Sequence, residues 1–122
     1  MLANKIYSDA LRLAAKEGRV DVVQFLVERG VIKDDADHEG KTALFLAAEN
    51  DHLPVVQYLV EQGADKDKAL NDGTSPLTIA AFNGHLPVVQ YLVEQGADKD
   101  KTNNKGNSPL YLAAQNNHGR LG

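Results

Sequence analysis

Short apolar clusters and longer polar stretches alternate along the chain, and the alternation returns every 33 residues. The segment His52–Lys68 reads HLPVVQYLVEQGADKDK, and His85–Lys101 repeats it letter for letter. A looser copy, VVQFLVERG, covers Val22–Gly30. A fixed period of this length is typical of a repeat architecture, in which each unit is one small structural module.

Each unit contains the signals of a first short helix. A residue with a side-chain oxygen precedes each apolar or small cluster, where it can accept a hydrogen bond from a backbone N–H of the next turn. These capping residues are Thr42, Ser75 and Ser108. Pro76 follows Ser75 directly, where a missing N–H has no consequence. The pattern predicts a helix over Pro76–Asn83 that ends at Gly84, and Asp51 and Asn117 hold the ending position in the neighbouring units. In the opening unit, Asp9-Ala10-Leu11 stands at the starting position.

A second helix with the sequence VVQYLVEQ follows, starting near Pro54 and Pro87. Its helical period places Val56, Leu59 and Val60 toward the core and the polar pair Gln57 and Glu61 toward water. Gly63 and Gly96 stop the two copies, because glycine adopts a left-handed C-cap conformation most easily. The polar connections that follow share a glycine, at Gly40, Gly73 and Gly106, which predicts a turn with positive φ.

Neither helix reaches the ~12–15 residues at which an isolated helix becomes even marginally stable in water. The units must therefore stack, and the pairs Ala47-Ala48, Ala80-Ala81 and Ala113-Ala114 let neighbouring helices approach closely. We expect one all-α solenoid domain over residues 1–122, divided into an opening repeat (1–36), two full repeats (37–69 and 70–102) and a truncated repeat (103–122).

Composition narrows the class of protein. Apolar residues make up 43% of the 122 residues, too many for a disordered chain, and the net charge of −4 does not favour nucleic acid as a partner. The absence of cysteine excludes disulfides, thiolate zinc sites and thiol catalysis. No apolar run approaches a membrane span, and charges interrupt the N-terminus where a signal peptide is apolar. We expect an intracellular, cytoplasmic protein with no cofactor.

The repeated unit resembles the ankyrin repeat family. The resemblance rests on the 33-residue period, Gly73-Thr74-Ser75-Pro76-Leu77, Ala80-Ala81, Gly84-His85-Leu86 and Gly96-Ala97-Asp98, and it covers about residues 9–118. It implies antiparallel helix pairs joined by projecting hairpin-like loops, with a concave face built from first helices and loop tips. Where the family usually has a bridging histidine after Pro-Leu, this chain has Arg12, Phe45, Thr78 and Tyr111, so we expect apolar contacts to replace part of the polar network.

Two more specific interpretations, a calcium-binding loop and a metal site formed by histidines, have little support in the sequence. Asp35, Asp37, Glu39 and Gly40 fall at calcium-loop spacing, but position twelve is Leu46 rather than a bidentate glutamate, so a solvated acidic loop is the better interpretation. His52, His85 and His118 are spaced one per unit, too far apart to share a metal ion, and resemble the family element that closes the turn between the helices. The serines are better used as caps than as nucleophiles, and no catalytic constellation converges. We therefore expect neither a metal site nor enzymatic activity.

The positions that vary between units predict a binding surface for a partner protein. At the loop tips they are His38, Glu39, Lys41, Asn71, Asp72, Thr74, Asn104, Lys105 and Asn107. On the first helices they are Phe45, Glu49, Asn50, Thr78, Phe82, Asn83, Tyr111, Gln115 and Asn116. Phe82 replaces the polar residues of the other units, which makes it a candidate hot spot, although it could instead fold back over Thr78.

The favoured function is a protein-interaction module, and the alternative is a structural spacer or engineered scaffold without a partner, which the identical 17-residue blocks also allow. After His118 the chain lacks the second helix that the period predicts. We expect a monomer, with end-to-end stacking at this uncapped end or a chain cut from a longer array as explanations of the exposed surface.

Overall fold

The computed structural model describes residues 2–121, and the side chains of residues 5–115 within them. In that range it contains seven α-helices and no strand. They are α1 (Leu2–Lys16), α2 (Val20–Glu28), α3 (Ala43–Glu49), α4 (Leu53–Glu61), α5 (Pro76–Phe82), α6 (Leu86–Glu94) and α7 (Pro109–Leu121). None of these helices is both long and apolar enough to cross a lipid bilayer.

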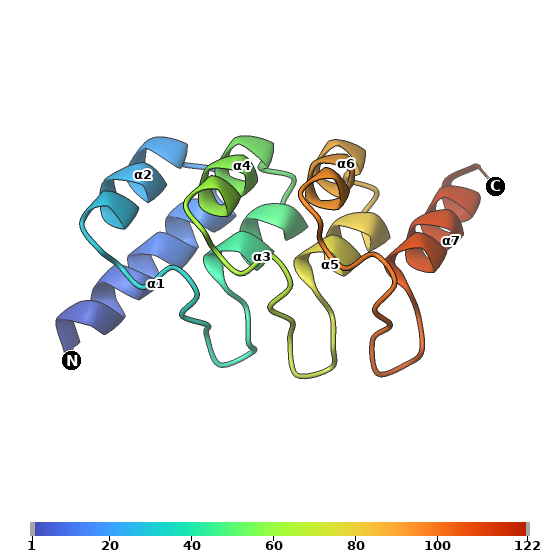
Figure 1. Ribbon diagram of the computed structural model, residues 1–122, viewed down its shortest axis with the longest axis horizontal. Coiled ribbons are helices and arrows are strands. Elements are labelled where there is room, and N and C mark those ends of the chain that lie inside the picture. Colours follow the sequence, from blue (N-terminus) through green and yellow to red (C-terminus); the bar gives the residue numbers. More distant parts are fainter. Residues whose placement is uncertain (1, 122) are drawn as a thin grey trace.

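The helices stand in two rows that run the length of the molecule (Figure 1). The first helices of the repeats, α1, α3, α5 and α7, pack side by side, and α2, α4 and α6 each pack on the first helix of their own repeat. Long loops project from the first-helix row beside one another. The expected all-α solenoid is thereby confirmed.

Side-chain caps start the first helices as predicted. The backbone N–H of Phe45 donates to Oγ1 of Thr42 at 3.2 Å, and the N–H of Thr78 donates to Oγ of Ser75 at 3.1 Å. Ser108 caps α7 in the same way, 3.1 Å from the N–H of Tyr111. The caps satisfy N–H groups that have no partner inside the helix.

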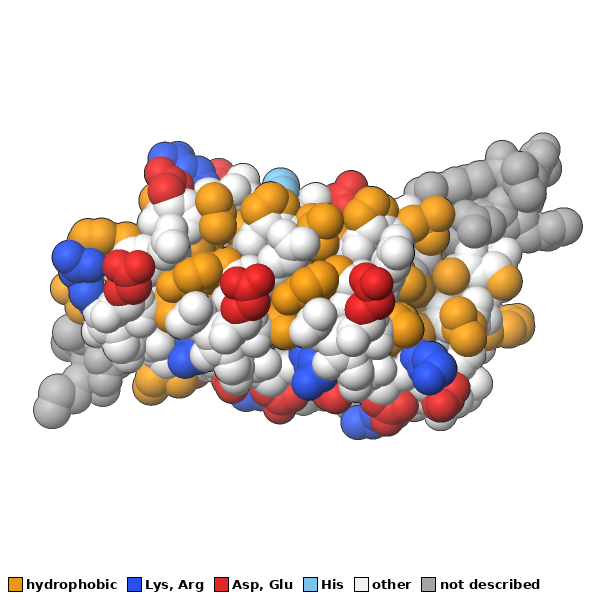
Figure 2. Space-filling view, turned by 45° about the horizontal axis from the view of Figure 1, so that its top comes forward, with side chains coloured by type: hydrophobic (Ala, Val, Ile, Leu, Met, Phe, Trp, Pro, Cys, Tyr) orange, Lys and Arg blue, Asp and Glu red, His pale blue; other side chains and the backbone are white. Residues whose placement is uncertain are grey.

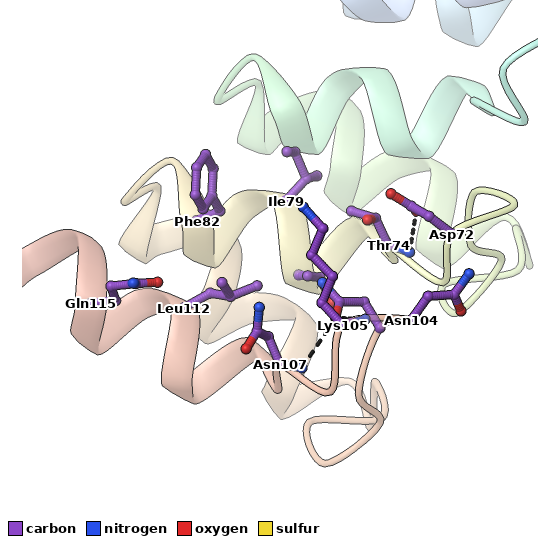
Figure 3. A pocket seen from close by; sticks show the side chains of 11 residues that line it. Asp72, Thr74, Ile79, Phe82, Asn104, Lys105, Asn107, Leu112 and Gln115 are labelled. Carbon is purple, nitrogen blue, oxygen red and sulfur yellow. Dashed lines mark hydrogen bonds between the residues drawn. The ribbon is translucent and has the colours of Figure 1, made fainter.

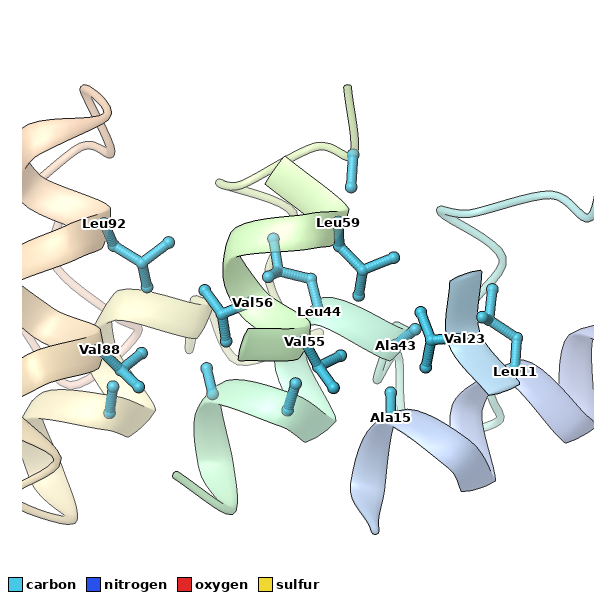
Figure 4. Packing of buried hydrophobic residues seen from close by; sticks show 14 of the residues in the cluster. Leu11, Ala15, Val23, Ala43, Leu44, Val55, Val56, Leu59, Val88 and Leu92 are labelled. Atoms are coloured by element: carbon cyan, nitrogen blue, oxygen red, sulfur yellow. The ribbon is translucent and has the colours of Figure 1, made fainter. Parts of the chain in front are cut away.

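The core lies between the two rows and consists of small and aliphatic side chains (Figure 4). Val56 and Leu59 are fully buried and Glu61 is exposed, as predicted for α4. Val60 and Gln57 are both half-buried, so the predicted faces are confirmed only in part. Val55 is fully buried as well, although the sequence pattern did not single it out. Because α4 packs on α3, α2 and α6, a wider arc of its surface is covered than one amphipathic stripe.

The connections between repeats form similar turns. In the first, the N–H of Asp37 donates to the carbonyl of Lys41 and the N–H of Gly40 donates back to Asp37, both at 3.0 Å. The loops at Leu70–Thr74 and Asn103–Asn107 make the same pair of bonds. The glycine of each turn has a φ between 80° and 89°, as predicted.

Polar contacts between repeats, which the sequence did not predict, hold successive units in register. The carboxylates of Asp34 and Asp67 each accept a backbone N–H from the next repeat at 2.9 Å, from Asp65 and Asp98 respectively. The Nε2 atom of His85 lies 2.9 Å from the carbonyl oxygen of Glu49. This contact supports a structural role for the periodic histidines; the side chain of His118 lies outside the described residues.

The two terminal helices differ from expectation. Helix α1 begins at Leu2, so Asp9 lies inside the helix, where its carboxylate pairs with the guanidinium of Arg12 instead of capping. Helix α7 continues to Leu121, past the end predicted at Asn117. In the other repeats the turn after the first helix is closed by a backbone bond from the start of the second helix, such as His85 N–H to Ala80 at 2.9 Å, and no second helix follows α7 within the described residues.

Candidate functional site

A groove of about 360 Å³ lies between the third and fourth repeats, bounded by two loop tips and two first helices (Figure 3). One wall is the loop of Asp72 and Thr74, and the other is the loop Asn103–Asn107. Helices α5 and α7 supply the apolar residues. We call it the α5–α7 groove; its lining residues are Asp72, Thr74, Thr78, Ile79, Phe82, Asn103, Asn104, Lys105, Asn107, Leu112 and Gln115.

The apolar part of the groove comes from consecutive turns of the two helices. Ile79 and Leu112 occupy equivalent positions, 33 residues apart, on α5 and α7. Phe82 lies one turn beyond Ile79 at the end of α5, and half of its surface is exposed. Any packing of Phe82 onto Thr78 therefore leaves a large part of the ring accessible.

Backbone hydrogen bonds fix the two loop walls relative to each other. The N–H of Asn104 donates to the carbonyl of Asp72 at 2.8 Å, which links the two tips directly. The side-chain oxygen of Asn103 accepts the N–H groups of Lys105 at 2.9 Å and Asn107 at 3.1 Å. The polar walls are thus held by bonds that exist before any partner binds.

Aspartates in the tips are held in their charged form. The pKa of Asp72 lies below its ordinary value because the N–H and hydroxyl of Thr74 donate to the carboxylate, and the charge of Lys105 adds to this. For Asp37, desolvation raises the pKa, but the backbone N–H groups of Lys41 and Glu39 outweigh it and the net pKa is lowered. Both carboxylates are therefore occupied in local hydrogen bonds.

The corresponding hollow between the first and second repeats has a different chemistry. It measures about 220 Å³ and is lined by charged residues, among them Arg12, Lys16 and Glu39. Inside it, Nζ of Lys41 pairs with Oε1 of Glu49 at 3.4 Å. In the α5–α7 groove, Asn107 and Gln115 hold the positions of Lys41 and Glu49, and Phe82 holds the position of Lys16, so neutral amides replace the ion pair and an aromatic ring replaces an ammonium group.

The structure gathers twelve of the predicted contact residues in these two hollows. The α5–α7 groove holds Asp72, Thr74, Thr78, Phe82, Asn104, Lys105, Asn107 and Gln115, and the first hollow holds Glu39, Lys41, Glu49 and Asn50. His38 borders a separate hollow against α1, and its side chain is 89% exposed. Asn71 is exposed at its loop tip, and Asn83 is half-buried, with its amide donating to the carbonyl of Glu49 at 3.2 Å.

Two predicted contact residues are corrected by the structure. Phe45 is 1% exposed and Thr78 is 2% exposed, so neither offers more than a trace of surface to a partner. Within its own repeat, Thr78 also shares a 2.8 Å hydrogen bond with Ser75. Tyr111, at the equivalent position of α7, is 55% exposed. The side chain of Asn116 lies outside the described residues.

Sequence reasoning missed three lining residues of the α5–α7 groove: Ile79, Leu112 and Asn103. Ile79 and Leu112 stand at a position that is apolar in every repeat, which reads as core. Asn103 begins and closes its own turn, and this structural function gives no sign that it also lines a groove. The sequence signal that pointed to this loop was Lys105, two residues on, because the charge at its position differs between repeats.

The residues considered for metal binding and for nucleophilic catalysis make local structural contacts. No group of three or more His, Cys, Asp or Glu side chains there could hold a metal ion. In the acidic loop, the Asp37 carboxylate accepts the N–H groups of Glu39 and Lys41, both at 2.9 Å. Ser75 and Ser108 are engaged as helix caps.

The family model for ankyrin repeats (three copies) matches residues 2–69 and 65–121. The chain belongs to the ankyrin repeat family. Ankyrin repeats are generally modules of protein–protein interaction, and the family is typically non-catalytic. No curated protein sequence is significantly similar to the chain.

Proposed function

We propose that this ankyrin-repeat chain binds a partner protein through the face formed by its loop tips and first helices, with the α5–α7 groove at the centre. The observation that carries the proposal is the position of Phe82. Phe82 is a half-exposed aromatic ring at the end of α5, where it lines the groove. The other repeats carry polar or charged residues at the equivalent position. Aromatic side chains in such positions are enriched among binding hot spots.

Preorganisation supplies the mechanism. The loop tips of the third and fourth repeats are tied to each other through Asn104 and Asp72, and each of the three tips is closed by its own backbone bonds. Little conformational entropy remains to be lost when a partner orders the loops, so more of the contact energy appears as affinity.

The opposite face is uniform along the stack. Figure 2 brings the second-helix row forward and shows acidic side chains at regular intervals with hydrophobic side chains between them. Its uniformity follows from the identical copies His52–Lys68 and His85–Lys101, which contain α4 and α6. The variation that distinguishes one partner from another lies instead on the loop and first-helix face.

A binding role fits the groove, because the carboxylate of Asp72 and the side-chain oxygen of Asn103 are engaged in their own turns, while some other polar side chains of the lining make no hydrogen bond within the described residues. The competing proposal is a structural spacer without a partner of its own. The sequence identity of the two copies favours it, since a spacer needs only regular stacking.

Site-specific photo-crosslinking in cells that express the chain separates the two. Benzoylphenylalanine replaces Phe82 in one variant and Phe25 in the other. Both residues are exposed to a similar extent, 50% and 52%, but Phe25 lies on α2 in the second-helix row. We expect a discrete crosslinked adduct from position 82 and none from position 25.

An adduct at position 25 alone would contradict binding through the loop and first-helix face. No adduct at either position would favour the spacer. Circular dichroism melting of both variants establishes that the replacement leaves the fold intact.

A further inference from the structure

We propose that the α5–α7 groove binds a peptide segment in which a large apolar side chain is followed within a few residues by a carboxylate. This inference rests on the proposed function and names the kind of partner that the groove selects. The apolar side chain occupies the hollow between α5 and α7, and the carboxylate pairs with Lys105.

Three lining residues give the groove its apolar surface. Ile79, Phe82 and Leu112 line one continuous stretch across the two helices (Figure 3). At the position of Phe82 the first, second and fourth repeats have Lys16, Glu49 and Gln115. An apolar side chain placed against this stretch displaces water from an aliphatic and aromatic surface instead of desolvating an ion pair.

The dimensions suit a peptide side chain. A volume of about 360 Å³ lies at the lower end of the roughly 300–1,000 Å³ found for small-molecule pockets. It holds one large side chain with its adjoining backbone. The amides of Asn104, Asn107 and Gln115 around the hollow can donate to and accept from that backbone.

Lys105 supplies the charge that selects a carboxylate. The first two loop tips carry Glu39 and Asp72 at this position, so the fourth repeat reverses the sign. Figure 3 shows the Lys105 side chain reaching across the groove toward Ile79. Within the described residues no carboxylate oxygen lies within 4.0 Å of its ammonium group.

The nearby acid does not neutralise Lys105 by contact. The carboxylate of Asp72 is turned to its own loop, where Oδ1 accepts the N–H of Thr74 at 2.9 Å. The first hollow shows the alternative arrangement, because there Lys41 is already paired with Glu49 at 3.4 Å. The α5–α7 groove thus combines an apolar surface with an ammonium group that, among the residues whose side chains are described, pairs with no carboxylate.

The test selects 12-residue peptides from a random display library against the intact chain and measures their affinities by fluorescence anisotropy. We expect the enriched peptides to share a large apolar residue with Asp or Glu within about three positions. Phe82→Gln, which installs the residue of the fourth repeat, is expected to weaken them roughly tenfold or more. Phe25→Gln, at an equally exposed aromatic, is expected to leave the affinity unchanged.

A double-mutant cycle isolates the charge. Lys105→Gln and replacement of the peptide acid by its amide are each expected to weaken binding about three- to tenfold, and the two together no more than either alone. Peptides that lose affinity with Phe82→Gln but not with Lys105→Gln or the amide peptide overturn this inference and leave the proposed function standing. Peptides indifferent to Phe82→Gln contradict both, and failure to enrich any peptide overturns the inference alone, provided the crosslink at position 82 is found.

Discussion

Gly18 closes the turn between α1 and α2, and the ring of His52 from the next repeat lies directly against it. The φ of Gly18 is 75°, and a Cβ added there would lie 2.5 Å from Nδ1 of His52. Gly63 ends α4 with a φ of 89°, but a Cβ added at Gly63 would meet nothing within 4 Å. The two glycines therefore share a backbone requirement and differ in their surroundings.

The pair gives a matched prediction. Gly63→Ala is expected to lower the free energy of unfolding by about 1 kcal/mol, because only the left-handed backbone conformation is penalised. Gly18→Ala is expected to lower it by at least about 1 kcal/mol more, because the His52 ring must move as well. Urea denaturation measures both values. In a His52→Ala background the difference should shrink, and equal losses for the two alanine variants in the wild-type background would show that the histidine does not press on this turn.

Asp72 predicts a pH dependence of stability. Its folded pKa is lowered by the hydrogen bonds from Thr74, so its contribution is fully present above the unfolded pKa and is lost as pH falls through the folded pKa. Between about pH 5 and pH 2 the wild-type chain should therefore lose more stability than Asp72→Asn. Urea midpoints at the two pH values measure the difference.

Glu94→Gln, which removes an exposed carboxylate from α6, is the control. If Asp72→Asn retains the full acid-induced loss, the hydrogen bonds to Asp72 do not favour its charged form.

The first helices depend on their caps because they are only seven residues long in α3 and α5. Ser75 is buried, accepts the N–H of Thr78 and shares a second hydrogen bond with the Thr78 hydroxyl. Ser108 makes only the first of these contacts and is less buried.

Ser75→Ala is expected to lower the free energy of unfolding by about 2 kcal/mol, and Ser108→Ala by about 1 kcal/mol or less. The excess at Ser75 reflects the Thr78 hydroxyl, which loses its partner in a buried site. Thermal melts of the two variants compare them directly, and an equal loss would mean that the Ser75–Thr78 side-chain contact contributes nothing.

Local chemistry explains which elements could be predicted from the sequence. Capping residues, Pro76, the helix-ending Gly63 and Gly96, and the turn glycines each act within a few residues, so their signals survive in a single sequence. The end of α7 could not be predicted in this way, because the turn that ends α5 depends on a second helix packing back onto the first. The start of α1 was missed because the periodic pattern begins at Asp9, whereas the helix begins at Leu2.

The candidate site was predicted in part for a similar reason. Variation between repeats marked Phe82 and the loop tips, because positions free of structural constraint differ between units. It also marked Phe45 and Thr78, which vary and yet are buried. The two residues hold equivalent positions of successive repeats, so a buried position can also differ between repeats, and variation alone does not identify a surface position.

Taken as a whole, the stack shows how far burial depends on a following repeat. Leu77 is 1% exposed, whereas Leu110, one repeat later, is 60% exposed. Leu86 is 54% exposed, although Leu53 at the equivalent position of α4 is half-buried. Identical chemistry thus gives different burial according to what packs beside it.

A chain in which LPVVQYLVEQGADKDK replaces residues 119–122 should therefore be more stable. The added segment supplies a second helix to the fourth repeat, and covering one leucine contributes about 1.5–3 kcal/mol. Differential scanning calorimetry is expected to show a melting temperature several degrees higher. The control carries the same segment with its inward valines and leucines changed to serine, and a gain equal to that of the apolar segment would mean that stacking is not its source.

The most direct test of recognition by the loop and first-helix face is a hydrogen-exchange footprint. Amide exchange of the chain is compared with and without the partner captured at position 82. We predict slowed exchange confined to residues 71–83 and 103–115, with α2, α4 and α6 unchanged. Slowed exchange centred on α2, α4 and α6, with the loop tips unaffected, would contradict recognition by the loop and first-helix face.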